Sequence, residues 1–302
     1  MSTSGPSPAA LAHAASIAGP HAEVHAVRPL AGGSHAGTYL VTTEAPHREL
    51  VLREFPPGDD AAHREVRVLA ALNGLAGLAP RLLAADPDAT WSDRPSVLIS
   101  RLPGTADLNP RDPRRWAREL GRALARVHAT AASGLASLPT LSDRPGGSTR
   151  VLGGPTADLV LADWERIRQL PRVLTHYDFW SGNVLWAGDT LSGVVDWCGA
   201  ALGPAEFDVG WLRIDLYLLY DRHIADEFLA AYRALAGPCA VDETLADLWT
   251  LARSHDDVET WSGNYVDLGR ADLTGPVLRH RHTAWTREVL HRHATVVPDA
   301  ER

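Results

Sequence analysis

Two hydrophobic periodicities divide this chain, and they constrain its fold more than any other feature. Before Pro103-Gly104, the alternation of apolar residues predicts several strands, and helical spacing predicts a helix at 61–72. After that dipeptide, which breaks regular structure, the apolar spacing becomes mainly helical. This order predicts an α+β fold with a strand-rich N-terminal lobe and a helix-rich C-terminal lobe. The predicted strands are residues 24–30, 37–42, 49–55 and 97–101.

The C-terminal part is predicted to be helical except for one loop and one hairpin. Residues 131–156 are rich in Gly, Ser and Pro and are predicted to form the loop. Two short apolar runs on either side of Gly188-Asp189 predict the hairpin, with strands at 183–186 and 191–197. The predicted helices are residues 113–129, 157–169, 209–220, 224–235, 241–254 and 278–293. A further short helix is predicted near the N-terminus, at 8–18.

The size and composition of the chain indicate an ordinary globular protein. Its 302 residues can bury a sizeable core, which we expect to be shared between two lobes. The sequence has no run of 18 apolar residues, so no membrane span is expected. No Lys or Arg precedes Arg28, and the two cysteines, Cys198 and Cys239, lack metal-ligand spacing. We therefore expect a cytoplasmic protein in a reducing compartment.

The chain contains no lysine, so all 29 of its Lys and Arg residues are arginines. A Walker-type phosphate loop requires a lysine, and so does an enzyme that forms a Schiff base with its substrate or cofactor. Both classes of chemistry are therefore excluded. Any phosphate-binding cation in this chain must be an arginine.

The net charge of −8 argues against non-specific nucleic-acid binding, because such proteins present basic surfaces. The charge is unevenly distributed along the chain. Residues 178–302 are strongly acidic, whereas residues 1–177 carry a slight excess of basic residues. This asymmetry suits a cationic substrate beside an anionic cofactor, and it suits equally well a solvated acidic surface.

One segment holds most of the functional information. It reads His-Tyr-Asp-Phe-Trp-Ser-Gly-Asn from His176, and a strand ending Val-Val-Asp-Trp follows the hairpin. Asp178 can orient an attacking hydroxyl and accept its proton. Asn183 and Asp196 supply the oxygen ligands that Mg²⁺ prefers, and the hairpin is expected to bring them back towards each other. Taken together, these residues predict phosphoryl transfer.

This segment resembles that of the aminoglycoside phosphotransferase family of protein-kinase-like small-molecule kinases. That family has His-Gly-Asp, then Asn, then a strand ending Asp-Trp; here Tyr177 replaces the Gly. The segment from Leu202 to Val209 resembles another family segment, in which the residue matching Asp208 supports the catalytic loop. The resemblance covers most of residues 24–235 and implies a bilobal fold. Its antiparallel-sheet N-lobe would be residues 21–104 and its mainly helical C-lobe residues 105–302, after an N-terminal tail and short helix at 1–20.

The resemblance implies roles for residues of the N-lobe, which would bind ATP or GTP with Mg²⁺. Arg53 occupies the position of the usual phosphate-binding lysine, and Glu65 on the following helix would pair with it. An arginine contacts phosphate oxygens through a planar fork, so its geometry would differ from that of lysine. The remaining implied nucleotide-binding residues are Gly32, Gly33, Ser34 and Gly37 over the phosphates, and Ser100 and Leu102 at the hinge beside the adenine.

The acceptor hydroxyl is less well defined by the sequence. An acidic group near an aromatic residue, together with Trp180 beside the motif, could hold a cationic acceptor such as an aminoglycoside. The ten tryptophans would equally suit a macrolide, and the family also accepts small metabolite alcohols. The candidate acceptor residues are Trp180, Asp256, Asp257, Glu259 and Trp261.

We therefore expect a small-molecule O-phosphotransferase that transfers the γ-phosphoryl group directly. Two alternatives belong to other classes. The absence of lysine is compatible with a nucleotide-binding pseudokinase that acts as a partner module. A protein kinase is disfavoured, because the sequence Ala-Ala-Leu-Gly-Pro begins at Ala200, soon after Asp196, and leaves no room for an activation loop.

Overall fold

The computed structural model describes residues 5–30, 36–131, 135–140, 152–238 and 240–296. Its contacts divide the chain into two compact units. The N-terminal unit comprises Met1–Thr105 and Leu185–Gly199, and the C-terminal unit comprises Ala106–Val184 and Ala200–Arg302. The hairpin that the sequence analysis placed in the C-lobe therefore groups with the N-terminal unit.

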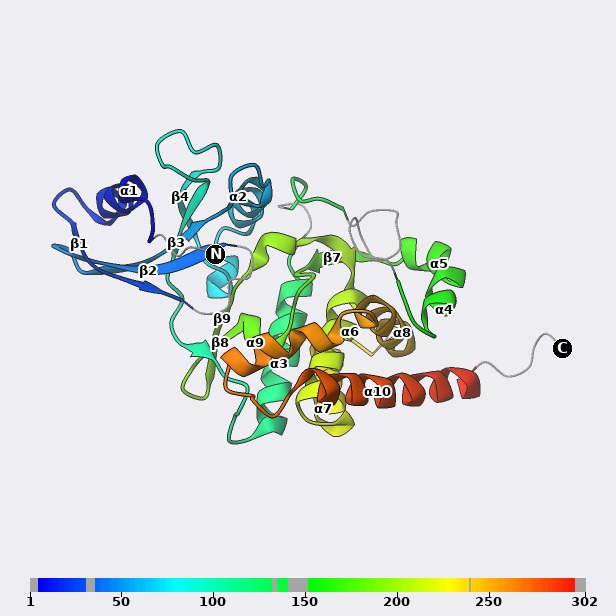
Figure 1. Ribbon diagram of the computed structural model, residues 1–302. Coiled ribbons are helices and arrows are strands. Elements are labelled where there is room, and N and C mark those ends of the chain that lie inside the picture. The colour runs from blue at the N-terminus through cyan, green and yellow to red at the C-terminus, as the bar shows by residue number, and fades with distance from the viewer. Residues whose placement is uncertain (1–4, 31–35, 132–134, 141–151, 239, 297–302) are drawn as a thin grey trace. The chain divides into compact units, whose positions relative to one another are not determined.

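The N-terminal unit is built on a five-stranded antiparallel sheet with the order β1-β2-β3-β5-β4 (Figure 1). The four strands predicted in this region are present, and β4 is an addition. Alanine has a low strand propensity, so the Leu-Leu-Ala-Ala-Asp sequence of β4 gave little signal. The strands are β1 Glu23–Pro29, β2 Gly37–Glu44, β3 Arg48–Glu54, β4 Leu82–Asp86 and β5 Ser96–Ser100.

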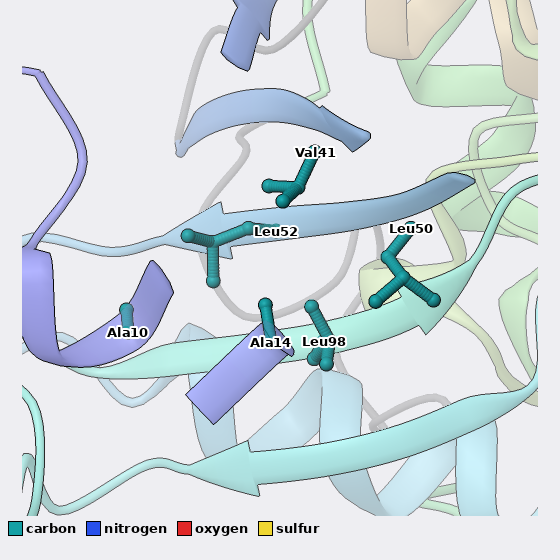
Figure 2. Packing of buried hydrophobic residues seen from close by; sticks show 6 residues of the cluster. All are labelled: Ala10, Ala14, Val41, Leu50, Leu52 and Leu98. Carbon is teal, nitrogen blue, oxygen red and sulfur yellow. The ribbon is translucent and has the colours of Figure 1, made fainter. Parts of the chain in front are cut away.

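Helix α1, Pro8–Ala18, packs on this sheet. Its N-terminus is capped by Ser7, whose side chain accepts a hydrogen bond from the Ala10 amide. Small residues let the helix approach the strands closely, and the cluster they form is shown in Figure 2. Burying each leucine of this cluster contributes about 1.5–3 kcal/mol. The cluster comprises Ala10, Ala14, Val41, Leu50, Leu52 and Leu98.

Two further elements of the N-terminal unit position its candidate functional residues. Helix α2, Ala61–Leu72, follows β3 and has the bounds predicted from the sequence. The predicted hairpin is also present, as β8 Val184–Ala187 and β9 Thr190–Val194, with Gly188 at a left-handed φ of 62° in its turn. Strand β6, Thr105–Ala106, completes a three-stranded sheet in the order β6-β8-β9.

The C-terminal unit is mainly helical, as predicted. Its helices approach one another closely at two glycines. A Cβ on Gly121 of α3 would lie 2.5 Å from the Phe228 carbonyl of α7, and a Cβ on Gly210 of α6 would lie 2.2 Å from the Ala246 carbonyl of α8. The helices are α3 Pro113–His128, α4 Ala157–Ala162, α5 Trp164–Arg168, α6 Ala205–Leu219, α7 Arg222–Ala236, α8 Glu243–Ser254, α9 Ser262–Asp267 and α10 Gly275–Val296.

The single helix predicted at 157–169 is wrong, because the chain turns at Asp163 between α4 and α5. A small sheet that was not predicted pairs β7, Arg172–Thr175, with β10, Ala201–Pro204. Neither strand shows a long alternating pattern, so tertiary pairing decides their structure. Strand β7 leads directly into the His-Tyr-Asp motif.

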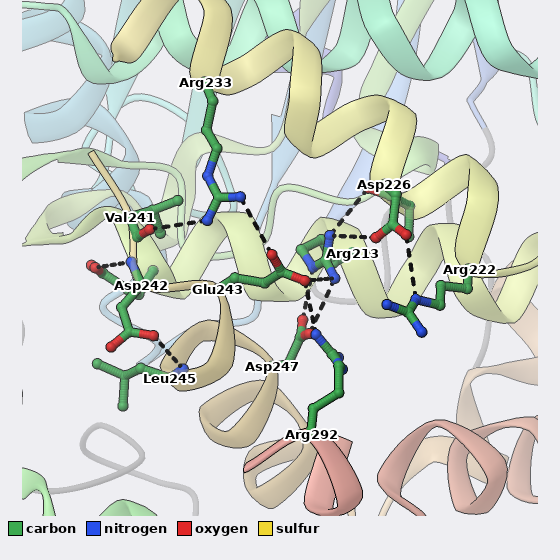
Figure 3. A network of polar contacts seen from close by, with 12 residues as sticks. Arg213, Arg222, Asp226, Arg233, Val241, Asp242, Glu243, Leu245, Asp247 and Arg292 are labelled. Carbon is green, nitrogen blue, oxygen red and sulfur yellow. Dashed lines mark hydrogen bonds and ion pairs between the residues drawn. The ribbon is translucent and has the colours of Figure 1, made fainter. Parts of the chain in front are cut away.

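A buried charge network joins helices of the C-terminal unit (Figure 3). The side chain of Arg213 is fully buried, and it pairs with Asp247 at 2.8 Å and with Glu243 at 3.0 Å. Arg292 of α10 binds the same two carboxylates, each at 2.8 Å. These pairs neutralise two of the acidic residues that give the C-terminal half its negative charge. Among the described residues, no helix is long and apolar enough to cross a membrane.

Candidate functional site

The motif loop begins at the end of β7 and is held by one buried carboxylate. Asp208 of α6 accepts hydrogen bonds from the backbone amides of His176 and Tyr177, both at 2.7 Å. Its Oδ2 also lies 3.1 Å from Nε2 of His128 on α3. A fully buried carboxylate needs such donors, and here they fix the backbone immediately before Asp178.

Tyr177 has a left-handed backbone conformation, with φ at 67°. A non-glycine residue in this region is strained by about 1–2 kcal/mol. This conformation explains in physical terms why a glycine would be favoured at the position. The tyrosine side chain lies against Phe207 and Trp249, with ring centroids 6.2 and 6.1 Å away.

The carboxylate of Asp178 is oriented by two donors. The indole Nε1 of Trp211 on α6 donates to Oδ1 at 3.0 Å. The amide Nδ2 of Asn183 donates to the Asp178 carbonyl at 2.9 Å and to Oδ2 at 3.3 Å. The sequence analysis did not find Trp211, because a tryptophan on an apolar helix carries no signal for this contact.

The turn that carries Asn183 is anchored by a second buried carboxylate. Asp215 accepts hydrogen bonds from the amide and hydroxyl of Ser181, the first of them at 2.9 Å. The hydroxyl of Tyr265 on α9 donates to its other oxygen at 2.7 Å. Burial raises the pKa of Asp215, and the hydrogen bonds from Ser181 and Tyr265 oppose this shift. Asp215 and Ser181 were also missed by the sequence analysis.

In the N-terminal unit, Arg53 of β3 lies between two carboxylates. Its Nη1 is 2.8 Å from Glu65 of α2, which confirms the predicted ion pair, and its Nη2 is 3.1 Å from Asp196. Burial raises the pKa of Glu65 to about 7, although Arg53 opposes this shift. Burial also works against the charge on Arg53, but Glu65 and Asp196 together raise its pKa above the ordinary value.

Asp196 follows β9 by two residues and also has a left-handed φ, at 63°. The thiol of Cys198 donates to its Oδ1 at 3.3 Å. Burial raises the pKa of this thiol beyond its usual range, and the charge on Asp196 adds to the shift. The backbone conformation and these donors together set the direction of the Asp196 carboxylate.

The other residues implied for nucleotide binding lie at the start of β2, at the end of β5 and beside the hairpin, or outside the described residues. Gly32, Gly33 and Ser34 lie outside the described residues, and Gly37 begins β2. The amide of Ser100 donates to the Arg81 carbonyl at 2.9 Å, so this donor is used within the unit. Leu102 packs on the hairpin, where a Cβ on Gly193 would lie 2.5 Å from its Cδ1.

The candidate acceptor residues separate into two groups. Glu259 forms an ion pair with Arg279 of α10, and this contact lowers the pKa of the carboxylate. Asp256 packs against Gly153, where an added Cβ would lie 2.7 Å from the carboxylate, while the Asp257 carbonyl accepts the amide of Thr260 at 2.9 Å.

The aromatic candidates contact other aromatic rings. Trp261 contacts Trp211, the donor to Asp178, with ring centroids 5.1 Å apart. The ring of Trp180 meets that of Tyr265 edge-on, with centroids 5.7 Å apart. The ring contacts therefore connect Trp261 to Asp178 through Trp211.

A model of the phosphotransferase enzyme family (APH) matches residues 26–249 of the sequence. This match spans more than half of the chain. The chain belongs to the phosphotransferase enzyme family. The predicted fold, with its antiparallel-sheet N-terminal part and helical C-terminal part, is confirmed by solved structures of that protein-kinase-like type.

Curated relatives of this phosphotransferase-family chain include two homoserine kinases. The one from Beijerinckia indica subsp. indica is 35% identical over 133 residues, which cover 38% of this chain and 40% of the relative. The one from Methylobacterium sp. is 29% identical over 160 residues, which cover 47% and 49%. The matches thus span about half or less of the length of these curated relatives.

Solved structures of similar fold include a macrolide phosphotransferase and LicA. The macrolide 2′-phosphotransferase MphH from Brachybacterium faecium is 18% identical, with a TM-score of 0.59, and the match covers 92% of this chain and 98% of MphH. LicA in complex with AMP is 15% identical, with a TM-score of 0.62 and coverage of 94% and 98%. At these identities the likeness shows the fold alone.

The donor set of this family member fits a magnesium ion. The Asn183 amide nitrogen donates to the Asp178 carbonyl and carboxylate, so the amide oxygen is the atom suited to a metal. The described residues contain no cluster of three or more His, Cys, Asp or Glu side chains placed to hold a metal. An amide oxygen is a ligand type that Mg²⁺ accepts, and that ion completes its shell with phosphate and water oxygens.

Proposed function

We propose that the chain is an ATP-dependent O-phosphotransferase that transfers the γ-phosphoryl group to a hydroxyl of a small molecule. The orientation of Asp178 carries this proposal. Trp211 and Asn183 each donate to its carboxylate, and Asp208 holds the backbone before it. A carboxylate held in this way can bind an acceptor hydroxyl and receive its proton, as in-line phosphoryl transfer requires.

The other proposed roles follow from charge and donor chemistry. Asn183 and Asp196 would hold Mg²⁺, which neutralises charge on the nucleotide phosphates when it is bound. The Arg53 guanidinium, already fixed by Glu65, would donate to phosphate oxygens. Structures of similar fold in complex with ATP and with AMP support ATP over GTP as the donor.

The acceptor best supported is a small hydroxylated amino acid of the homoserine type. The curated relatives are homoserine kinases, although the matched length is partial. Glu259, a candidate for binding a polycationic antibiotic, is already neutralised by Arg279. An aminoglycoside or a macrolide is the second candidate, supported by the names of similar structures.

An acceptor panel tests this proposal. Purified protein is incubated with MgATP and homoserine, other amino-acid alcohols, another small metabolite alcohol, an aminoglycoside or a macrolide, and the products are analysed by mass spectrometry. We expect one phosphoryl group on an amino-acid alcohol and equimolar ADP. Phosphorylation of the antibiotics alone would replace the acceptor class. The absence of both a phosphorylated product and ADP release would contradict the enzymatic proposal.

The pseudokinase alternative has one observation in its favour, which is the absence of lysine from the chain. In that case MgATP would bind without turnover. Calorimetry of MgATP binding is therefore run beside the acceptor panel, and ADP release is measured without any acceptor. An enzyme whose acceptor is missing from the panel would transfer the phosphoryl group slowly to water and release ADP, whereas a nucleotide-binding module would not.

A further inference from the structure

Arg253, near the end of α8, lies among three aromatic rings. The carbon at the centre of its guanidinium group is 4.1 Å from the ring centroid of Tyr177 and 4.6 Å from that of Trp211. The ring of Trp249 is 5.2 Å away. At these distances the guanidinium group is attracted by the ring quadrupoles, and its planar shape lets it stack on aromatic faces.

The two nearest rings belong to residues linked directly to Asp178, one by the peptide chain and the other by a hydrogen bond. Tyr177 precedes Asp178 in the chain, and Trp211 donates a hydrogen bond to its carboxylate. Arg253 Nη1 also donates to the Tyr177 carbonyl, at 3.4 Å, which is the peptide group that leads into Asp178. One side chain therefore contacts two of the groups that determine where this carboxylate points.

We infer that Arg253 is a positioning residue for Asp178 and that it acts mainly by holding Tyr177 in its left-handed conformation. The inference rests on the proposed function of Asp178 as the base. Most residues disfavour a positive φ, so the side chain at 177 needs external contacts to remain there. Arg253 supplies these through the ring stack and the carbonyl hydrogen bond.

Glycine at position 177 would adopt the same backbone without strain and would need no such support. This difference gives the inference a sharp test. Arg253→Met removes the guanidinium but keeps an unbranched apolar chain, and it is made in the wild-type and Tyr177→Gly backgrounds. A coupling between the two positions reports whether Arg253 acts through Tyr177.

In the wild-type background, Arg253→Met should lower kcat by about 10–100-fold, because small displacements of a reacting group carry costs of this size. The KM for MgATP should change by no more than about twofold, because the nucleotide contacts are unaltered. In the Tyr177→Gly background the same substitution should lower kcat by less than about threefold. The kcat of Arg253→Lys should lie between those of Arg253→Met and the wild type, because a lysine ammonium group is not planar and cannot stack on the rings.

A second readout does not depend on turnover. The indole N–H of Trp211, assigned with Trp211→Phe, should exchange with solvent hydrogen faster in Arg253→Met than in the wild type. Arg126→Met, on an exposed position of α3, is the matched control and should change neither readout. Absence of turnover by the wild type would contradict the proposed function, and the exchange experiment would still decide the positioning role.

Three results would overturn the inference. The first is an unchanged kcat and unchanged Trp211 exchange in Arg253→Met. The second is an equal loss of kcat in both backgrounds, which would mean that Arg253 does not act through Tyr177. The third is an effect confined to the acceptor KM, which would mean that Arg253 contacts the acceptor itself.

Discussion

Nη2 of Arg53 donates to Oδ1 of Asp196 across 3.1 Å, while Nη1 of the same guanidinium donates to Glu65 at 2.8 Å. A lysine has a single terminal nitrogen, whereas the fork of an arginine lets two nitrogens serve two carboxylates. The pair thus links β3 and α2 to the residues after β9. In a chain without lysine, Arg53 can therefore serve both the structure of the N-terminal unit and the proposed phosphate contact.

Replacement of Arg53 should destabilise the protein as well as impair its activity. Arg53→Met leaves Glu65 and Asp196 without their shared partner, and the free energy of unfolding should fall by about 3–5 kcal/mol, as expected when one member of a buried pair is removed. Denaturant unfolding followed by circular dichroism measures this change. Arg48→Met, at an exposed position of the same strand, should change the stability by less than about 0.5 kcal/mol. Equal stabilities of wild type and Arg53→Met would contradict the structural role.

Asp196→Asn should abolish magnesium-dependent ATP binding. The substitution keeps the shape of the side chain but removes the charge that would hold the metal. Isothermal titration with ATP, with Mg²⁺ and then with EDTA, measures the effect. In the wild type the affinity should drop when EDTA is added, and in Asp196→Asn the two titrations should agree. Asp189→Asn, in the exposed turn of the same hairpin, is the control and should retain the wild-type response.

His282 of α10 should make stability depend on pH. Burial lowers its pKa to about 4, with contributions from Arg279 and His255. The unfolded chain therefore binds a proton near pH 6.5 that the folded chain does not bind until near pH 4. Its contribution to stability is present above pH 6.5 and is lost as the pH falls, by about 3 kcal/mol in total.

Urea unfolding of wild type and His282→Gln at pH 7 and pH 4.5 checks this prediction. The wild type should lose more stability than the variant over this interval. His291→Gln, at an exposed position of the same helix, should behave like the wild type. A wild-type loss equal to that of His282→Gln would show that the histidine is not kept neutral in the folded protein.

Elements with strong local signals were predictable from the sequence. The helix at 61–72 has the predicted bounds, and the helix predicted at 113–129 ends one residue earlier, at His128. A proline and an aspartate cap mark the start of α3, and regular apolar spacing marks both helices. Asp178, Asn183 and Asp196 could be proposed from the sequence because their spacing within one segment is itself the signal.

The groups that orient these residues were not predictable. Trp211 is 33 residues from Asp178, and Asp215 is 34 residues from Ser181. Arg253 is 76 residues from Tyr177. Such contacts depend on how α6 and α8 pack, and nothing in the local pattern of either helix indicates them. Strands β7 and β10 were missed for the same reason, since pairing with a distant partner gives them their structure.

The most direct test of this account is the turnover of Asp178→Asn compared with its affinity for MgATP. The substitution keeps hydrogen-bond capacity but removes the base, so kcat should fall by about 10²–10⁴-fold. MgATP affinity from calorimetry should stay within about twofold of the wild type. Asp158→Asn, at an exposed position of α4, should leave both quantities unchanged. A wild-type kcat in Asp178→Asn would contradict phosphoryl transfer with Asp178 as the base.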